Sequence, residues 1–272
     1  MVSQNLLESD IENILQTALT SADDLVVVNP SPTTIRELVS SMDGLEEVPA
    51  VNVLADERAL KDVMDDFLVA SSAADLVADD VLSLRVLDDD PVNSLLVSKE
   101  SVISIVKAGD QVAGLTTTDE QFVEQAYNHY NGLWEDAETF SLRTPPLSTV
   151  RETLMSDIGE GAATDFDAVL DSLQTARGDG DGLDEVTISL LVAAKNGELL
   201  YDISKWGEDI GLASKATFSR TKTQLEDMGL IDTEKVPIDV GRPRLRLRLG
   251  DDRLNAAEAD ELASVAQSLI AS

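Results

Sequence analysis

Residues Leu199–Leu249 read LLYDISKWGEDIGLASKATFSRTKTQLEDMGLIDTEKVPIDVGRPRLRLRL, and their pattern predicts the structure of the second half of the chain. Two apolar stripes at helical spacing are separated by a turn at Gly211, and Gly229 ends the second helix before two short strands. Helix, turn, helix and hairpin in this order are typical of a winged helix-turn-helix. The predicted elements are helices at 184–196, 201–210 and 215–228 and strands at 231–236 and 244–249.

Basic residues concentrate in this stretch of a strongly acidic chain. The 272 residues carry a net charge of -32, yet residues 183–250 hold ten basic side chains against eleven acidic ones. Within Ser214–Arg248 the balance is positive, with eight basic residues against five acidic ones. A basic region on a polyanion favours a nucleic-acid backbone as its partner.

The helix at 215–228 is predicted to be the recognition helix, with Ser214 as its N-cap. Its N-terminal half carries the residue types that reach base edges and phosphates. In the hairpin, Gly241-Arg242-Pro243-Arg244 is expected to form the tip, and the arginines of the returning strand share one face. Base contacts are expected from Thr217, Ser219 and Arg220, phosphate contacts from Lys222, Arg242, Arg244 and Arg246, and a further contact from Lys215.

A second interpretation of the same domain stays open. A winged helix can also bind proteins, and the arginines at 244–248 would then pair with the chain's own carboxylates. The presence of basic residues on both the third helix and the wing favours double-stranded DNA.

The composition is that of a globular protein with an acidic surface. Hydrophobic residues make up 43% of the chain and aromatic residues 4%, so aliphatic side chains must form the cores. The 52 acidic residues against 20 basic ones suit a high-salt cytoplasm, where 1 M salt screens charges beyond about 3 Å. Cysteine is absent, the first residues do not read as a signal peptide, and no apolar run reaches the roughly 20 residues that span a bilayer. We therefore expect a soluble, cytoplasmic protein without membrane contacts.

The first half of the chain predicts an α/β domain. Apolar strands at 25–28 and 51–54 each lead into a helix, which is the repeat of a parallel α/β unit. Closely spaced strands between 82 and 116 predict a meander added to the sheet. Helices are expected at 5–20 and 119–139.

Residues that follow the first two strands are candidates for binding a small-molecule effector. The turn after the first strand precedes a helix whose amides could hold an anion, and the acid after the second strand stands where nucleotide folds often bond a ribose. A glycine-rich fingerprint is missing, so a capped helix and a surface acid are the simpler interpretation. A sugar phosphate or an NAD(H)-type nucleotide is the sharper hypothesis. The predicted effector residues are Asn29, Ser31, Asp56 and Arg58.

Catalytic and metal sites are not expected. His129 is the single histidine, it lies inside a predicted helix, and cysteine is absent. No His/Cys metal spacing and no coherent acid–base or nucleophile set can be built from these residues. We expect a protein that is not an enzyme. The alternative is an enzyme acting on a nucleotide or sugar phosphate, with the winged domain used for docking.

Several segments resemble the TbsP family of haloarchaeal transcriptional regulators. They are the opening SQNLLESDIENIL, the block LADERALKDVMDDFLVASSAADLVAD and the run from GDGDGLDEV to GDDRL. The segment NSLLVSKESVISIV and the helix after it are similar to the end of a TrmB-type effector domain. The resemblance covers essentially the whole chain, and it implies metabolite-controlled regulation of gluconeogenic and glycerol-linked genes. TrmB-type proteins place the DNA-binding domain first, so none of their sugar-binding residues is transferred.

The expected architecture is an α/β effector domain with a mixed sheet, followed by an α+β winged helix-turn-helix domain. A homodimer is expected, because helix-turn-helix modules gain affinity from two half-sites. A metabolite would act through the helices at 148–176, which precede a Gly/Asp linker at 178–182. The predicted boundaries are 1–145 for the effector domain, 146–182 for the connector and linker, 183–250 for the winged domain and 251–272 for a C-terminal helix.

Overall fold

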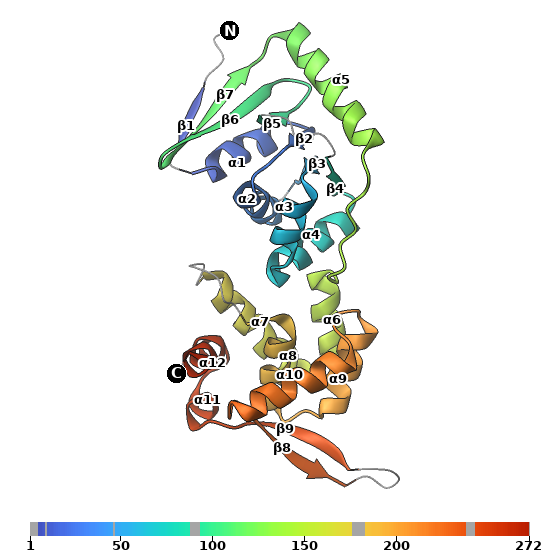
Figure 1. Cartoon of the computed structure of the whole chain (residues 1–272), viewed down its shortest axis with the longest axis vertical. Helices are drawn as coiled ribbons and strands as arrows, with labels where there is room; N and C mark the ends of the chain where they lie inside the picture. The colour runs from blue at the N-terminus through green and yellow to red at the C-terminus, as the bar shows by residue number, and fades with distance from the viewer. Residues whose placement is uncertain are drawn as a thin grey trace. The chain divides into compact units, whose positions relative to one another are not determined.

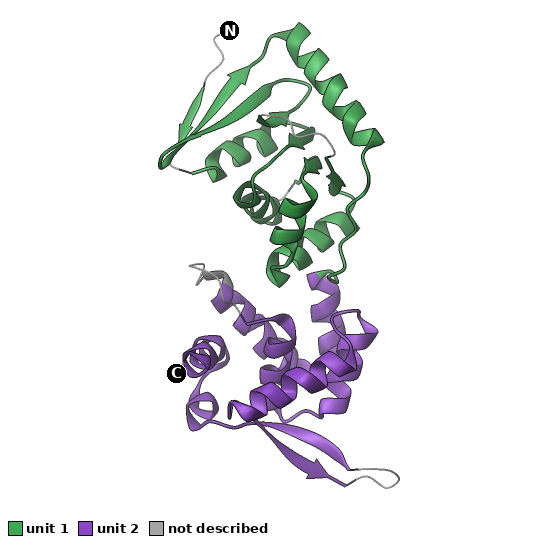
Figure 2. Cartoon of the chain, viewed as in Figure 1, with its two compact units in different colours: residues 1–146 green, residues 147–272 purple. Residues whose placement is uncertain are grey.

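The computed structural model describes residues 5–8, 10–45, 47–87, 93–175, 183–237 and 243–271, without the side chains of residues 174 and 175. The chain forms two compact units, Met1–Pro146 and Leu147–Ser272 (Figure 2). The predicted linker at 178–182 lies outside the described residues.

Unit 1 contains a seven-stranded mixed sheet (Figure 1). Its strands are β1 (Leu6–Glu8), β2 (Asp24–Val28), β3 (Ala50–Ala55), β4 (Leu82–Val86), β5 (Ser94–Val97), β6 (Val102–Ala108) and β7 (Gln111–Thr117). Their spatial order is β1-β7-β6-β5-β2-β3-β4. The strands β2, β3 and β4 are parallel, and all the other pairings are antiparallel. The expected parallel unit with an added meander is therefore present, but β4 extends the parallel part instead of opening the meander.

Helices cover the two faces of this sheet unequally. They are α1 (Glu12–Ser21), α2 (Pro32–Asp43), α3 (Glu57–Met64), α4 (Phe67–Ala78) and α5 (Glu120–Asp136). The first four pack on one face, where the larger core brings together Ile14, Ile35 and Leu60 (Figure 1). On the other face, α5 covers a smaller core around Val28 and Val123.

Two details of unit 1 differ from the prediction. Residues 6–8 form a strand paired with β7 and are not part of the helix expected at 5–20. A short apolar run beside a helix has no periodicity of its own, so only its pairing partner determines its structure. The helix expected to run on from Asp56 is divided in two, because the side chain of Asp66 accepts hydrogen bonds from the amides of Leu68 and Val69 and begins α4.

Polar contacts hold α5 near its middle and at its C-terminal end. Near its middle, the Tyr127 hydroxyl donates to Asp24 Oδ2 at 2.5 Å, and Lys99 Nζ donates to the same oxygen at 2.8 Å. At its C-terminal end, the guanidinium of Arg85 lies 4.0 Å from the centre of the Trp134 ring and donates to the carbonyl of Trp134 at 2.7 Å. These contacts fasten α5 over the parallel strands.

Unit 2 is helical with a two-stranded sheet. Its elements are α6 (Leu147–Asp157), α7 (Glu160–Thr175), α8 (Glu185–Asn196), α9 (Leu200–Asp209), α10 (Lys215–Asp227), β8 (Ile231–Val236), β9 (Arg244–Leu249), α11 (Asp252–Ala256), the short 3₁₀ helix η1 (Ala259–Glu261) and α12 (Leu262–Ile270). The helices α8, α9 and α10 and the antiparallel pair β8–β9 form the predicted winged helix-turn-helix. The single helix expected at the C-terminal end is divided into α11, η1 and α12.

The centre of unit 2 is α8. All of its residues from Val186 to Ala194 are buried, which is the property of a helix surrounded by others. The helices α6 and α7, expected in a connector, pack into this unit: Trp206 Nε1 donates to Thr153 Oγ1 at 3.0 Å, and Asn196 Nδ2 donates to Asp165 Oδ2 at 2.7 Å. These two helices therefore belong to the scaffold of the winged domain.

Candidate nucleic-acid interface

The turn between α9 and α10 brings the two helices into close contact. Gly211 in this turn has a φ of +79°, a conformation that favours glycine. On α9, a Cβ at Gly207 would lie 2.3 Å from the ring of Phe218, which is fully buried. The lack of a side chain at Gly207 therefore lets α10 lie directly on α9 and sets its direction.

A polar face of α10 is exposed beyond this contact. Ser214 Oγ accepts a hydrogen bond from the backbone amide of Thr217 at 3.1 Å, which confirms the predicted N-cap. Thr217 itself is half-buried, and its hydroxyl lies 3.0 Å from the Ser214 hydroxyl. The exposed polar side chains that follow on the helix, ahead of the acidic Asp227 at its end, are Ser219, Arg220, Thr223 and Gln224.

Sequence reasoning selected the first two of these four residues and missed the others. Thr223 and Gln224 each lie four positions after a predicted base contact, and residues four apart share a helix face. This spacing could have identified them.

Both lysines of α10 are paired with carboxylates. Lys215 Nζ donates to Glu208 on α9, and this hydrogen bond lowers the pKa of Glu208 and raises that of Lys215. Lys222 was expected to be exposed for a phosphate contact, but it is only 9% exposed, and its Nζ lies 2.6 Å from Glu226 Oε2. Its alkyl stem packs against the domain, so the expectation of an exposed Lys222 is wrong.

The wing places its arginines beside acidic residues. Arg244 lies 3.3 Å from Asp202 and 4.3 Å from the centre of the Tyr201 ring. Arg248 lies 3.3 Å from Glu234 on β8. The alternative interpretation, in which the arginines pair with the chain's own carboxylates, therefore describes these two side chains.

The third arginine of β9 is held differently. Arg246 is half-buried, and its buried Nε has no hydrogen-bond partner among the described residues. It faces Glu198, whose pKa is raised because burial and Asp202 outweigh the lowering effect of Arg246. Leu199 forms a bridge with Arg246, so β9 lies between β8 and this short segment. Arg242 lies outside the described residues.

The predicted effector residues lie where the parallel strands β2 and β3 end. Asn29 has a φ of +47°, and its amide donates to the Leu54 carbonyl at 2.8 Å, which continues the pairing of the two strands. Ser31 caps α2 and Asp56 caps α3 through their side chains. The structure therefore brings these residues to one edge of the sheet, in the capping roles of the simpler interpretation. Arg58 is exposed in the first turn of α3.

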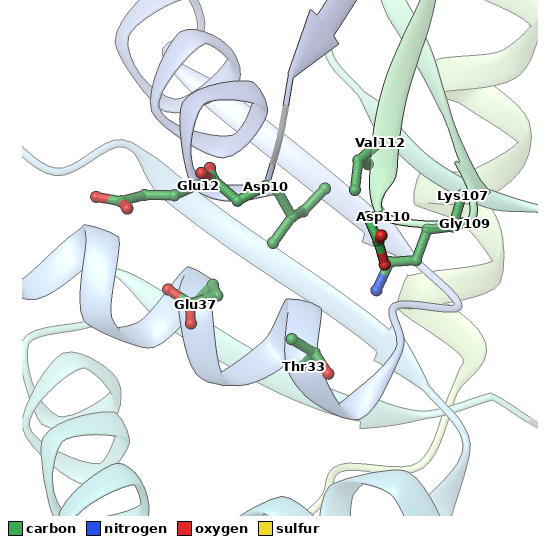
Figure 3. Close-up of a pocket in the computed structure, with 9 residues that line it drawn as sticks. Asp10, Glu12, Thr33, Glu37, Lys107, Gly109, Asp110 and Val112 are labelled. Atoms are coloured by element: carbon green, nitrogen blue, oxygen red, sulfur yellow. The ribbon is translucent and has the colours of Figure 1, made fainter. Parts of the chain in front are cut away.

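A hollow of about 390 Å³ lies beside this edge, between the beginnings of α1 and α2 and the turn from β6 to β7 (Figure 3). Lys107 reaches from it toward Ser31, with 3.5 Å between Nζ and Oγ. The other charged side chains of the lining are all acidic. They are Asp10, Glu12, Glu37 and Asp110. The hollow therefore disfavours an anion except near Lys107, which sequence reasoning did not select.

No group of three or more His, Cys, Asp or Glu side chains in the described parts of the chain has the arrangement of a metal site. His129 is exposed on α5 beside Tyr130. None of the described helices is long and apolar enough to cross a membrane.

Comparisons with known proteins agree with this division of the chain. The family model for the N-terminal part of TbsP-like transcriptional regulators matches residues 3–145, and the model for their C-terminal helix-turn-helix domain matches residues 146–267. No curated protein sequence matches the chain.

Solved structures show only distant likeness. The archaeal chromatin protein TrmBL2, solved in a study of its DNA binding, is 16% identical with a TM-score of 0.36, and the match covers 51% of this chain and 55% of that one. The phospholipase D family member Nuc from Salmonella typhimurium is 13% identical with a TM-score of 0.34, covering 50% of this chain and 99% of that one. NucT from Helicobacter pylori is 15% identical with a TM-score of 0.34, and the match covers 50% of this chain and 99% of that one.

Proposed function

The chain belongs to the TbsP-like family of transcriptional regulators, and from this membership we propose that it recognises promoter DNA in a halophilic archaeon and controls gluconeogenic and glycerol-linked genes. It does so as a DNA-binding regulator and not as an enzyme. The observation that carries the proposal is the exposed polar face of α10, held by a close helix contact and flanked by a wing.

Base recognition falls to the exposed residues of α10. Arg220 is exposed, and no side chain is bonded to its guanidinium in the described part of the chain, so its fork of donors is available for the O6 and N7 atoms of a guanine. Ser219, Thr223 and Gln224 offer shorter polar groups on the same face. Thr217 lies near the start of the helix, where hydroxyls and backbone amides suit a phosphate.

Phosphate binding requires an exchange of ion pairs. Lys215, Arg244 and Arg248 are already paired with carboxylates, so a phosphate must displace Glu208, Asp202 and Glu234. Each displaced carboxylate then takes up a cation, which offsets the cation released from the DNA. We therefore expect affinity to fall less steeply with rising KCl than the number of basic contacts alone would give.

The proposed effector binds at the edge of the sheet where β2 and β3 end. Asn29, Ser31, Asp56 and Arg58 lie at this edge, where α/β folds bind ligands, and Lys107 supplies a cation within reach of Ser31. The cations Arg58 and Lys107 support a sugar phosphate or an NAD(H)-type nucleotide as the ligand, whose phosphate would replace the caps Ser31 and Asp56 at the helix amides. Binding there would adjust DNA affinity to carbon flux.

The decisive experiment compares the wild type with Arg220→Ala on fragments of the genome in molar KCl. Loss of one bidentate base contact is expected to cost about 1–3 kcal/mol and to relax the preference at one base position. Arg253→Ala is the matched control, because Arg253 is an exposed arginine that is paired with Asp251 and belongs to α11 and not to α10. Discrete promoters that are lost with Arg220→Ala and kept with Arg253→Ala are the expected result.

The same comparison can contradict the proposal. Equal binding of all fragments by the wild type, or binding that is indifferent to Arg220→Ala, would reject sequence-specific recognition by α10. The alternative function, an enzyme that docks through its winged domain, would then have to be tested by turnover of a nucleotide or sugar phosphate.

A further inference from the structure

One face of the meander in unit 1 is left without a covering helix. The helix α5 packs on β2, β3 and β5 and shares a core with Val102 at the start of β6, and it has no comparable contact with the rest of β6, β7 or β1 among the described residues. Cross-strand partners point to the same side of a sheet, so the register of β5, β6, β7 and β1 identifies the residues on the α5 side. This open face consists of Leu7, Leu95, Val102, Ser104, Val106, Ala108, Gln111, Ala113, Leu115 and Thr117.

No residue of the open face is charged, although 26% of the residues in the chain are. The charged neighbours Glu8 and Lys107 belong to the opposite side, where they lie across from Val112. An antiparallel sheet normally turns polar side chains to water on its exposed side. The composition of the open face is therefore that of a covered surface.

Leu95 and Val102, at the border with α5, are buried, and the rest of the face exposes large apolar side chains among the uncharged polar residues Ser104, Gln111 and Thr117. Leu7 is 67% exposed, Leu115 48% and Val106 43%, and Phe122 from the first turn of α5 is 52% exposed beside them. These are four of the five large apolar side chains exposed in the described part of unit 1, and the fifth, Val77, lies on α4 on the other side of the sheet. Exposed apolar residues gathered in one place mark an interaction surface.

A groove of about 330 Å³ runs along the border between the open face and α5. Phe122, Ala126 and Tyr130, spaced four residues apart on α5, form one wall, and Leu95, Val102 and Leu115 form the floor. No charged side chain lines it. The groove offers a hole for an apolar side chain and no positive charge for a phosphate.

The net charge of the chain indicates which partner binds the open face. With a net charge of -32, two copies repel each other wherever their acidic surfaces meet. An uncharged apolar face is complementary to itself and is the surface on which two copies can approach with the least repulsion. We propose that the open face, with Phe122, binds the same face of a second copy of the chain in an isologous homodimer.

This interface has a characteristic response to salt. Rising KCl screens the repulsion between the acidic surfaces while the apolar contact remains, so the dimer becomes tighter. An interface made of ion pairs would respond in the opposite direction.

The test measures self-association of the full-length protein in 2 M and 0.2 M KCl, without DNA, by sedimentation across a concentration series. Leu115→Asp and Phe122→Asp each place a charge on the open face and are expected to raise the dimer dissociation constant by at least about tenfold. Val77→Asp is the matched control, an exposed apolar residue of the same unit outside the face, and it should leave the constant unchanged. Circular dichroism of each variant verifies folding, and Phe122→Gln replaces any aspartate variant that unfolds.

Three results would overturn the proposal. The first is a wild-type monomer at all concentrations, which would assign the face to a different protein or to an apolar ligand. The second is a dimer that is unaffected by the charged variants, and the third is a dimer that tightens as salt is removed. Because no DNA is present, failure of the proposed promoter recognition would leave each of these results readable.

Discussion

Two helices, α10 and α5, lie on the surface of their units and differ in what holds them there. The helix α10 rests on α9 through apolar contact: Phe218 is fully buried, and Gly207 removes the side chain that would keep the helices apart. The helix α5 has Val123 as its one buried residue and is fastened by Asp24 and Arg85 through hydrogen bonds.

Because of this difference, the residues that position each helix are not the residues that it exposes. Apolar packing sets the direction of α10, so its polar face can carry residues chosen for a partner. In α5, polar contacts add to a shallow apolar packing, and Phe122 at its first turn is left exposed beside the open face of the sheet. Substitutions at the two attachments should therefore have different consequences.

The largest effect is expected from Gly207→Ala, which breaks the apolar attachment. The added Cβ would lie 2.3 Å from the Phe218 ring, so the ring or the whole of α10 must move. Overpacking of this kind costs about 1–3 kcal/mol, and the displaced helix should also lose DNA binding. Thermal unfolding and DNA titration measure the two losses. Gly132→Ala is the control, since a Cβ at Gly132 meets nothing within 4 Å; equal effects of the two variants would show that the close contact is not important.

A smaller effect is expected from Asp24→Asn, which breaks the polar attachment of α5. Burial alone would raise the pKa of Asp24, but hydrogen bonds from Lys99 and Tyr127 lower it below its usual value. A carboxylate with a lowered folded-state pKa stabilises the fold above the unfolded value of about 3.9, and this stability is lost as pH falls through the folded pKa. The variant should be less stable by about 1 kcal/mol at pH 7.

The pH series supplies the check on this prediction. Denaturant unfolding of wild type and Asp24→Asn should give curves that differ at pH 7 and converge as the pH falls below about 4. A constant difference from pH 7 to pH 3 would mean that the charge of Asp24 does not fasten α5.

The smallest effect is expected from Glu208→Gln, which leaves the direction of α10 intact and frees its first lysine. Lys215 would no longer have to leave a carboxylate in order to bind a phosphate, so DNA affinity should rise a few-fold. The decrease of affinity with rising salt should become steeper, by about one more cation released on binding. Stability should change by less than about 1 kcal/mol, since exposed ion pairs contribute little. DNA titrations from 0.2 to 2 M KCl measure both quantities, and weaker binding by the variant would contradict the exchange of ion pairs.

The sequence predicts well whatever depends on spacing along one element. The stripe of Ile203 and Trp206, the cap at Ser214 and the alternation in β9 all follow from local periodicity, and the winged fold follows from them. Pairings between elements do not follow from periodicity. The partner of Lys222 is four residues away on the same helix, but its burial depends on the whole domain, and the carboxylate beside Arg244 comes from α9.

The same limit explains the errors in unit 1. Residues 6–8 form a strand because β7 offers an edge, and β4 is parallel because of the helices that precede it. The open face could be found only when the register of β1, β6 and β7 showed which residues lie side by side.

The bridge between Leu199 and Arg246 helps to hold the wing at a fixed position relative to the recognition helix. It joins the wing to the segment before α9, while Thr233 on β8 donates to Glu226 on α10 at 2.8 Å. The wing and α10 are therefore fixed to the same domain. Two DNA-contacting elements held at a fixed separation select for groove width, because they cannot adapt to a different one. DNA whose grooves already have the matching width would be held without deformation, and a base sequence could thus be favoured at positions that no side chain touches.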